Sequence, residues 1–391
     1  MFIQIGVNFL LNSAMERLWL MVNGLQLIVA IPLIPVKYPA NAATLLGSLI
    51  DIANFDLVPV DLIYPYIYDF DESEAFNYEF EQAGYESGYL AENMGTVFVF
   101  AHFFALFYVI TAIAYVLRNK SKRMNKFYVY LRHKLLWNAV IIFLMEGYIE
   151  IGLSSISLIK TWNWDPNGDV NHKSNYVYAI IFLAIIVIFP VALVSLYYKH
   201  RKELDHKHFR HRFGGPFAGL QKRHKYRLMF YVFQYLSRRL AFVSFLIAYD
   251  DSILLSIFAV LLTTEVSLAW LLMYQPFETQ FRNRIEVFNE VILFLILFMT
   301  FCFADVMTPE GAETVGYYLI ALICFYLLLH IYSLASDSLS KVCYLIWLQL
   351  AKCRYGKVLQ KRIRRQAKRL IRRETMVKRP PPIVVEDTES E

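Results

Sequence analysis

Apolar residues recur along the chain in stretches long enough to cross a membrane, for which a helix needs roughly 20 residues. Eight such stretches follow one another in the sequence. Four carry no Asp, Glu, Lys or Arg (18–36, 93–117, 174–198 and 314–336), and four carry charges (135–159, 228–249, 252–275 and 287–304). The pattern predicts an all-α membrane protein, a polytopic bundle of about eight transmembrane helices.

Composition favours a membrane protein over a water-soluble one. Of the 391 residues, 57% are hydrophobic and 16% are aromatic, whereas only 18% are charged. A soluble domain of ordinary size is less apolar than this. We therefore expect an integral protein of the plasma membrane or of an endomembrane.

The distribution of charge predicts the side that each loop faces, because Lys and Arg accumulate on the cytosolic side of short connections. With eight helices, 34 of the 39 Lys and Arg residues fall on one side, including those of the basic loop 199–227. Segment 38–94 carries eleven Asp and Glu but no Lys or Arg. Both termini are thus predicted to be cytosolic, and 38–94 to form an acidic extracytosolic cap.

The same reasoning divides the chain into three parts. Residues 1–17 form a short cytosolic segment, 18–340 the transmembrane domain, and 341–391 a basic amphipathic tail that ends in an acidic disordered segment. No leader peptide with a basic start and a small-residue cleavage site is recognisable at the N-terminus. Insertion is therefore expected to rely on the internal apolar stretches.

The tail has the pattern of a helix that lies on a membrane surface. Between residues 352 and 373 it holds eleven Lys and Arg and no acid, interleaved with apolar residues. Contact with an anionic inner leaflet is expected, whereas calmodulin binding or a solvated tail are the alternatives. The basic residues expected to face lipid are Lys361, Arg362, Arg364, Arg365, Lys368 and Arg369.

Apart from Glu290 in the stretch 287–304, the charged residues inside the apolar stretches are Glu146, Glu150, Arg238, Arg239 and Glu265. Charges at such positions are costly and usually face the interior of the bundle or water. Glu146 and Glu150 are four residues apart on the third predicted helix, so we expect them to share one face. We expect one of them to approach Arg238, Arg239 or Glu265, either as a structural ion-pair network or as a route for cations or protons.

A second charged set lies at the start of the seventh stretch, where Glu286, Asn289 and Glu290 recur at helical spacing. The acidic residues would be stabilised there by the dipole of the helix N-terminus. Alternatively, with a group from another helix, the three side chains could form an oxygen-ligand cation site at the inner mouth of the bundle.

Catalytic signatures are not recognisable in the sequence. No Ser/His/Asp set, H-E-x-x-H motif or glycine-rich nucleotide fingerprint stands out, so we predict no enzyme, no cofactor and no resident metal. Nucleic acid is not an expected partner either. Channel, transporter and scaffold remain as functional classes, and assembly into an oligomer is left open.

Several short motifs resemble the TRP-like C-terminal membrane domain found on ciliate surface proteins, which is distantly similar to fungal TRP-like and polycystin-type proteins. They are "LWLMVNGLQLIVAIPLIPVKYPANA", "ENMGTVF", "FQYLSRRLAFVSFL" and "QPFETQFRNRIEVFNEVILF". The resemblance covers residues 8–340 and implies a multi-pass helical module grouped with ion channels. Such modules usually follow a cysteine-rich extracellular region, so we expect a short member or a detached module.

The resemblance implies a cation channel or transporter, with a non-conducting membrane anchor, scaffold or receptor module as the alternative. A tetrameric pore of this class needs a re-entrant helix and filter between its last two spans. The corresponding loop here, 305–316, is only twelve residues long. A pathway inside the bundle, lined by the buried carboxylates, is therefore favoured over a conventional tetrameric pore.

Overall fold

The computed structural model describes residues 17–53, 75–82, 85, 87–161, 170–204, 206–217, 219–221, 224–249, 251–304 and 306–354. Throughout this part of the chain the secondary structure is helical, with no strand. Contacts divide the chain into two compact units, one of Trp19–Leu328 and one of Met1–Leu18 with Leu329–Glu391. The prediction of an all-helical fold is confirmed.

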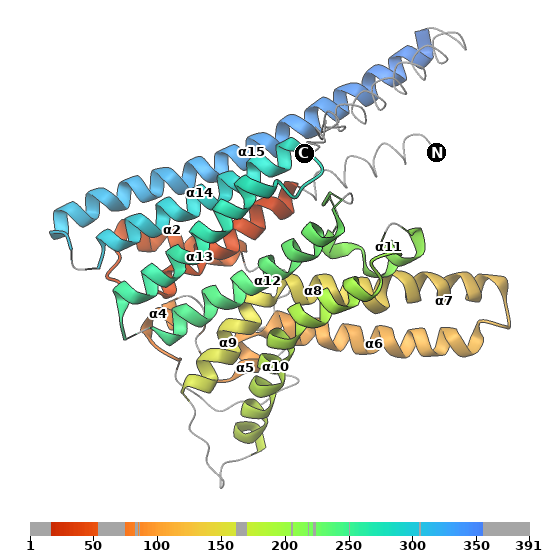
Figure 1. Ribbon diagram of the computed structural model, residues 1–391, viewed down its shortest axis with the longest axis horizontal. Coiled ribbons are helices and arrows are strands. Elements are labelled where there is room, and N and C mark those ends of the chain that lie inside the picture. Colours follow the sequence, from red (N-terminus) through yellow and green to blue (C-terminus); the bar gives the residue numbers. More distant parts are fainter. Residues whose placement is uncertain are drawn as a thin grey trace, which may run out of the picture. The chain divides into compact units, whose positions relative to one another are not determined.

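Figure 1 shows the helices, coloured in chain order. In order they are the apolar helix Arg17–Leu33, whose last turn is η1 (Ile31–Leu33), then α2 (Ala40–Ala53), α4 (Tyr78–Gln82), α5 (Leu90–Asn93), α6 (Gly95–Leu117), α7 (Lys122–Lys134), η3 (Leu135–Ala139), α8 (Val140–Glu146), α9 (Tyr148–Lys160), α10 (Val170–Lys199), α11 (Lys207–Phe213), η4 (Gly215–Phe217), α12 (Lys225–Ala248), α13 (Ile253–Tyr274), α14 (Gln280–Cys302) and α15 (Pro309–Arg354).

Five helices are long and apolar enough to cross a membrane: Val97–Leu117, Lys173–Lys199, Ile253–Tyr274, Gln280–Cys302 and Pro309–Tyr344. A sixth is added if the bent pair Lys122–Glu146 and Tyr148–Lys160 counts as one span. Large apolar side chains cover their outer surfaces, such as Leu106 on α6 and Leu262 on α13, which are 53% and 60% exposed. Such surfaces are suited to lipid, so the chain is an integral membrane protein.

The eight predicted spans are not confirmed, because two helices differ from simple apolar spans. The helix Arg17–Leu33 is shorter than the five and ends in a 3-10 turn that contains Pro32. Helix α12 carries Arg238 and Arg239 near its middle, and it also has basic residues in its first turn. Helix α10 continues from Val170 to Lys199 although Pro190 lies inside it.

The predicted span 135–159 is not one straight helix. It begins with a π-helical turn, η3, and the segments on either side of Gly147 make an angle of 60°. Glu146 ends α8 and Glu150 lies in the first turn of α9. The expectation that these two carboxylates share one helix face is therefore wrong, because the bend separates their surroundings.

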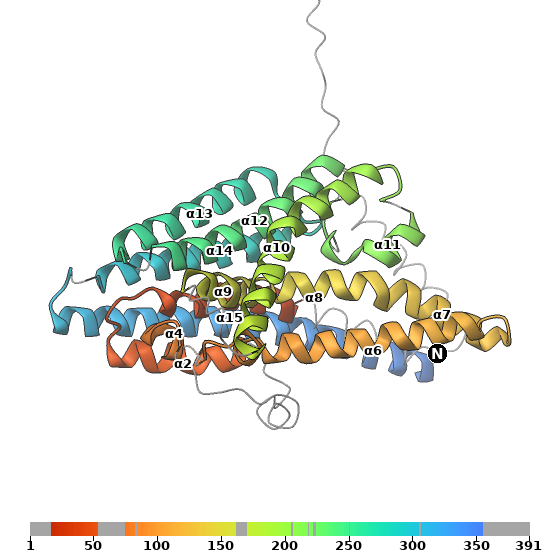
Figure 2. The ribbon, with the colours of Figure 1, turned by 90° about the horizontal axis from the view of Figure 1, so that it is seen from below.

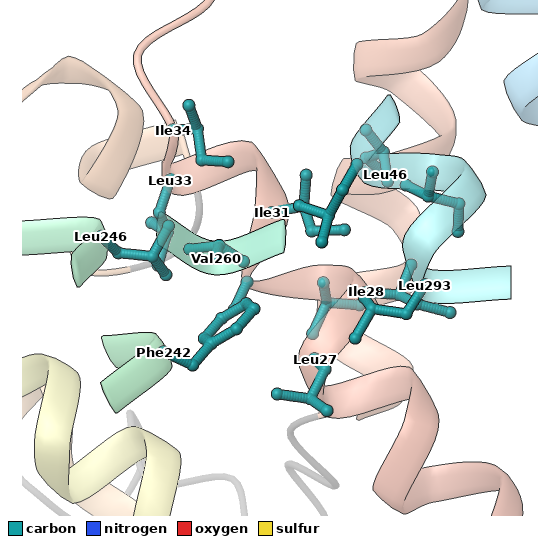
Figure 3. Close-up of a cluster of buried hydrophobic side chains, with 14 of the residues drawn as sticks. Leu27, Ile28, Ile31, Leu33, Ile34, Leu46, Phe242, Leu246, Val260 and Leu293 are labelled. Atoms are coloured by element: carbon teal, nitrogen blue, oxygen red, sulfur yellow. The ribbon is translucent and has the colours of Figure 1, made fainter. Parts of the chain in front are cut away.

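In the unit Trp19–Leu328, α12, α13 and α14 lie side by side, as do α6 and α7 (Figures 1 and 2). α9 packs against both α10 and α12. Two apolar cores fill the space between the helices. The first, shown in part in Figure 3, combines the helix Arg17–Leu33 and α2 with the C-terminal half of α12. The second combines α9 and α10 with the N-terminal half of α12.

The turn before α14, at residues 276–278, is hydrogen-bonded to the loop before α12. The amide of Glu278 donates to Gly219 O at 2.8 Å, and the amide of Gln221 donates to Pro276 O at 2.8 Å. Leu220 and Phe277 face each other in an antiparallel bridge. Because Gly219 has a φ of 78°, a conformation that favours glycine, this short pairing depends on its residue type.

In the other unit, Arg17 binds the second half of α15. Its guanidinium donates to Ser333 O at 2.9 Å and pairs with Asp337 at 3.0 Å. Lys341 approaches the same Asp337 carboxylate. These contacts fasten residue 17 to one turn of α15.

Candidate functional site

A layer of polar side chains separates the two apolar cores of the unit Trp19–Leu328. On α12 and α13, Arg238, Arg239 and Ser267 lie between buried residues of one core and buried residues of the other, whereas on α14 the polar members precede the buried residues of the first core. Polar groups in this position are surrounded by hydrocarbon and need partners within the protein. We call this set the polar layer: Asn23, Gln26, Tyr235, Arg238, Arg239, Ser267, Glu286, Asn289 and Glu290.

The strongest contact in the polar layer is the ion pair between Arg238 of α12 and Glu290 of α14. The two side chains are only 10% and 8% exposed. In such a dry setting, removal of one partner leaves an uncompensated charge, which is strongly destabilising. The pair therefore fixes α12 against α14 and keeps both charges at a defined depth in the bundle.

Arg239 is buried more deeply, with 2% exposure, and binds the first apolar helix. Its guanidinium donates to the side-chain oxygen of Gln26 at 3.2 Å and approaches the backbone oxygen of Asn23 at 3.4 Å. It also lies 4.3 Å from the centre of the Tyr235 ring, a distance at which the ring face attracts a cation. Arg239 is thus solvated by neutral groups.

Gln26 extends the network to the bent segment, because its amide donates to the backbone oxygen of Glu146 at 3.3 Å. The charges of Glu146 and Arg239 also act on each other across this contact. Of the two glutamates, Glu146 is therefore the one that lies near Arg239. Glu150, on the other side of the bend, lies where its charge acts on Tyr85.

A small cavity of about 30 Å³ opens within the polar layer. A buried water needs at least roughly 10–15 Å³ measured in this way, so about two water molecules fit. Its wall includes Asn23, Gly24, Tyr231, Gln234, Tyr235, Arg238, Arg239, Ser267, Glu286, Asn289 and Glu290.

Several buried polar atoms near this cavity have no hydrogen-bond partner among the described residues. They are Oε2 of Glu290, Oε2 of Glu146, and Nε and Nη2 of Arg238. Each is a charged group that favours a polar partner, and water is the smallest one. The arrangement can therefore hold a proton or a hydrated charge between α12 and α14.

The structure combines two sets of residues that the sequence analysis kept apart. Glu286 and Glu290, predicted at an inner mouth, line the same cavity as Arg238 and Arg239. Asn289 donates to the backbone oxygen of Leu20 at 3.1 Å. The cation site expected here required a ligand from another helix. Instead, α12 places the guanidinium of Arg238, which is itself a cation, against Glu290.

Glu265, the remaining predicted member, lies on the exposed surface of α13 and does not line the cavity. The six basic tail residues from Lys361 to Arg369 lie outside the described residues. Within the described chain, no group of three or more His, Cys, Asp or Glu side chains is placed to hold a metal ion.

Sequence reasoning missed the neutral members of the polar layer. Asn23 and Gln26 lie three residues apart in an otherwise apolar stretch, a spacing that puts both on one helix face. Amides at such positions commonly bind polar groups of a neighbouring membrane helix. This spacing was the available signal, although it does not identify the partner helix.

Comparison of the chain with protein-family models, with curated proteins and with solved structures finds no match.

Proposed function

We propose that this chain is an eight-helix integral membrane protein of the TRP-like class that moves protons or small cations by way of the polar layer. Both termini and the loop 199–227 lie in the cytosol in this proposal, and segment 38–94 lies outside. The polarity of the loops supports the orientation, because 34 of 39 basic residues then share one side.

The proposed count of eight spans is supported by the positions of the three segments that are not simple apolar helices. The three segments that a simple apolar criterion excludes or divides are the helix Arg17–Leu33, α12, and the bent pair α8 and α9. These are also segments that contribute polar groups to the network: Gln26, Arg239 and the backbone of Glu146. A helix shielded by its neighbours can carry charges that a lipid-facing helix cannot.

The observation that carries the functional proposal is the buried Glu290 carboxylate beside a water-sized cavity. One of its oxygens pairs with Arg238. The other has no partner within ordinary hydrogen-bond geometry among the described residues, although the Ser267 hydroxyl lies near enough to act on the carboxylate. Ionisable groups inside a membrane protein are costly and typically mark ion or proton pathways. Glu290 is therefore proposed as the group that exchanges the transported charge, with Arg238 as its resident counter-ion.

A non-conducting anchor or scaffold is the second candidate, and one observation favours it. The Arg238–Glu290 pair adjoins a cavity that holds only about two waters. A buried pair of this kind also serves to fix helix packing. In that case the basic tail and the acidic segment 38–94 would bind partners while the bundle stays closed.

Ion flux into liposomes that contain the purified protein distinguishes the two. We expect uptake of protons or monovalent cations above that of protein-free liposomes, and Glu290→Gln to reduce it about tenfold or more, the effect of losing about 1.4 kcal/mol of ion stabilisation. Glu265→Gln is the matched control, since it makes the same change at an exposed site of the neighbouring helix.

If Glu290→Gln does not fold, the double variant Arg238→Gln/Glu290→Gln removes both charges together and should restore folding. Wild-type protein with no flux above empty liposomes would contradict transport and favour the anchor. Equal flux in the Glu290 and Glu265 variants would contradict the role of the polar layer.

Membrane lipids are the proposed partners of the tail. Its basic residues would each contribute about 1 kcal/mol near an anionic leaflet. Calmodulin is the alternative partner, since its targets share the basic amphipathic pattern.

A further inference from the structure

A second and larger cavity lies between α9 and the segment that precedes α6. Its volume is about 320 Å³, within the range of small-molecule sites. It is distinct from the cavity of the polar layer, because the two share no lining residue. The wall consists of Ala75, Phe76, Phe80, Tyr85, Ser87, Gly88, Leu90, Asn93, Ser154, Ser157, Leu158 and Thr161.

One wall is an aromatic cluster. The rings of Phe76 and Phe80 meet edge to face at 4.9 Å between centroids, and Phe80 lies 5.7 Å from the ring of Tyr85. Leu90 and Leu158, which are almost fully buried, continue the apolar surface. Such a wall suits a flat or aliphatic body, because aromatic contacts add to the hydrophobic contribution.

The opposite part of the wall is held in place by hydrogen bonds. Asn175 of α10 accepts from the Leu90 amide at 2.8 Å and donates to Gly88 O at 2.8 Å. Asn93 donates to Ser87 O, and the Tyr89 amide donates to the Ser87 hydroxyl at 2.9 Å. The segment 87–93 is thus fixed before any ligand binds, which lowers the entropy lost on binding.

Ser154 supplies a polar group that is suited to a ligand. Its side chain is 2% exposed, and its hydroxyl has no hydrogen-bond partner among the described residues. A buried hydroxyl without a partner is unfavourable, and rotation of this side chain toward the cavity would let a bound oxygen atom remove this penalty. The hydroxyl of Ser157 already donates to Ser154 O at 3.2 Å and so has a partner in the helix.

Among the described residues that line the cavity there is no Asp, Glu, Lys or Arg. Burial raises the pKa of Tyr85 well above its usual range, so its phenol stays neutral. Two charged residues lie nearby but are not lining residues: Lys160 and Glu150. The Lys160 ammonium donates to Ile247 O at 2.8 Å and lies 5.9 Å from the centre of the Phe76 ring, and the charge of Glu150 acts on Tyr85. A charged ligand would therefore lose its hydration without gaining a counter-ion in the wall.

We propose that this cavity is a binding site for a small neutral amphiphile that presents one hydroxyl or carbonyl oxygen to Ser154 and an aromatic or aliphatic body to Phe76, Phe80 and Leu158. Its volume is about twice that of an engineered 150 Å³ cavity that holds benzene. A ligand of about a dozen non-hydrogen atoms therefore fits. The exposed Thr161 marks the rim by which such a molecule enters.

The test uses 1-naphthol, a neutral molecule of this size with one hydroxyl, and full-length protein in lipid nanodiscs. Equilibrium dialysis against protein-free nanodiscs separates specific binding from partition into lipid. We expect saturable binding of one molecule per chain. Its charged analogue 1-naphthalenesulfonate should bind at least about tenfold more weakly, because the wall offers it no counter-ion.

Three variants assign the binding to this cavity. Ser154→Ala should weaken 1-naphthol binding about threefold to tenfold, the effect of one neutral hydrogen bond, and leave naphthalene binding unchanged. Ser155→Ala is the matched control, because Ser155 is also fully buried with an unpartnered hydroxyl but does not line the cavity. Thr161→Trp, at the exposed rim, should obstruct entry and abolish saturable binding.

Removing a buried hydroxyl that has no partner is not expected to unfold the protein, and elution as a single species in size-exclusion chromatography checks this. The proposal is overturned if 1-naphthol shows no saturable binding beyond that of empty nanodiscs. It is also overturned if Ser154→Ala and Ser155→Ala weaken binding equally, or if the sulfonate binds as well as the naphthol. None of these results depends on ion flux.

Discussion

Gly24, in the apolar helix Arg17–Leu33, lies where α15 comes very close. A Cβ atom at this position would be 2.5 Å from the hydroxyl oxygen of Tyr326. That hydroxyl is itself held, because it donates to Met21 O at 2.6 Å. The contact therefore leaves no room for a side chain at residue 24 unless Tyr326 moves.

We expect Gly24→Ala to lower the stability of the protein by about 1–3 kcal/mol, the usual effect of overpacking. The double variant Gly24→Ala/Tyr326→Phe should recover part of this loss, because it removes the clashing oxygen. Gly47→Ala is the control: nothing lies within 4 Å of a Cβ there, and helix propensity should improve by up to about 1 kcal/mol. Thermal unfolding in detergent measures all three, and a Gly24→Ala protein as stable as the wild type would contradict the close contact.

Arg238 should be needed for the stability of the protein. Arg238→Met should destabilise the protein by about 3–5 kcal/mol, because Glu290 is left buried without its partner. Arg227→Met on the same helix is the control, since Arg227 is exposed and only lies over the Tyr274 ring at 5.5 Å. Its loss should be within about 1 kcal/mol. Similar melting temperatures for the two variants would show that the Arg238–Glu290 pair is not needed for stability.

The residue types of the polar layer were readable from the sequence, but their pairing was not. Arg238 and Glu290 are each obvious as charges within apolar stretches. Their contact depends on which helices are neighbours, and apolar periodicity carries no such information. Glu265 illustrates the same limit, because it has an equally apolar sequence context and yet lies on the exposed surface of α13.

Among the elements, Asn175 of α10 links this helix to α5 and to the residues just before it. Asn175 binds both the Leu90 amide and the Gly88 carbonyl oxygen. Asn175→Ala should therefore accelerate amide hydrogen exchange of Leu90 by about tenfold. Each neutral hydrogen bond that is lost lowers the free energy of local opening by about 1 kcal/mol.

Asn175→Asp is the informative partner variant, because a carboxylate can still accept from the Leu90 amide but cannot donate to Gly88. Leu90 should then exchange more slowly than in the alanine variant. Mass spectrometry of peptic peptides measures both. Unchanged exchange at Leu90 in Asn175→Ala would mean that other contacts hold this segment.

Apolar periodicity was sufficient to predict most helices but not their shapes. The stretches at 93–117, 174–198 and 287–304 correspond to α6, α10 and α14. The bend at Gly147 was missed, because the stretch is apolar on both sides of it and helical hydrogen bonds continue, with the Ile151 amide donating to Gly147 O at 2.9 Å. A bend of this kind depends on packing against other helices, which overrides local preference.

At the scale of the whole molecule, the proposed orientation is testable by proteolysis. In sealed vesicles with the cytosolic face outward, protease should cleave the loop 199–227 and the tail but leave segment 38–94 intact. Permeabilising the vesicles should then make 38–94 accessible, which serves as the internal control. Cleavage within 38–94 before permeabilisation would refute the orientation and the eight-span arrangement.

The tail provides a second test at this scale. Trypsin should cleave between residues 352 and 373 more slowly when the full-length protein is in nanodiscs with acidic lipid than in neutral ones. The protection should decrease as salt is raised, because it is electrostatic. Equal cleavage in both lipids would argue against a lipid-bound tail.

The pairing of 219–221 with 276–278 holds the starts of α12 and α14 together. Both helices start shortly after this pairing and run in the same direction. Whether Arg238 and Glu290 face each other therefore depends on how many residues separate each of them from the paired segments. One extra residue after His224 would turn Arg238 by about 100° and advance it by about 1.5 Å relative to Glu290. The same residue added after Ala248 lies beyond the ion pair and leaves the count unchanged, so chain length matters more at one end of α12 than at the other.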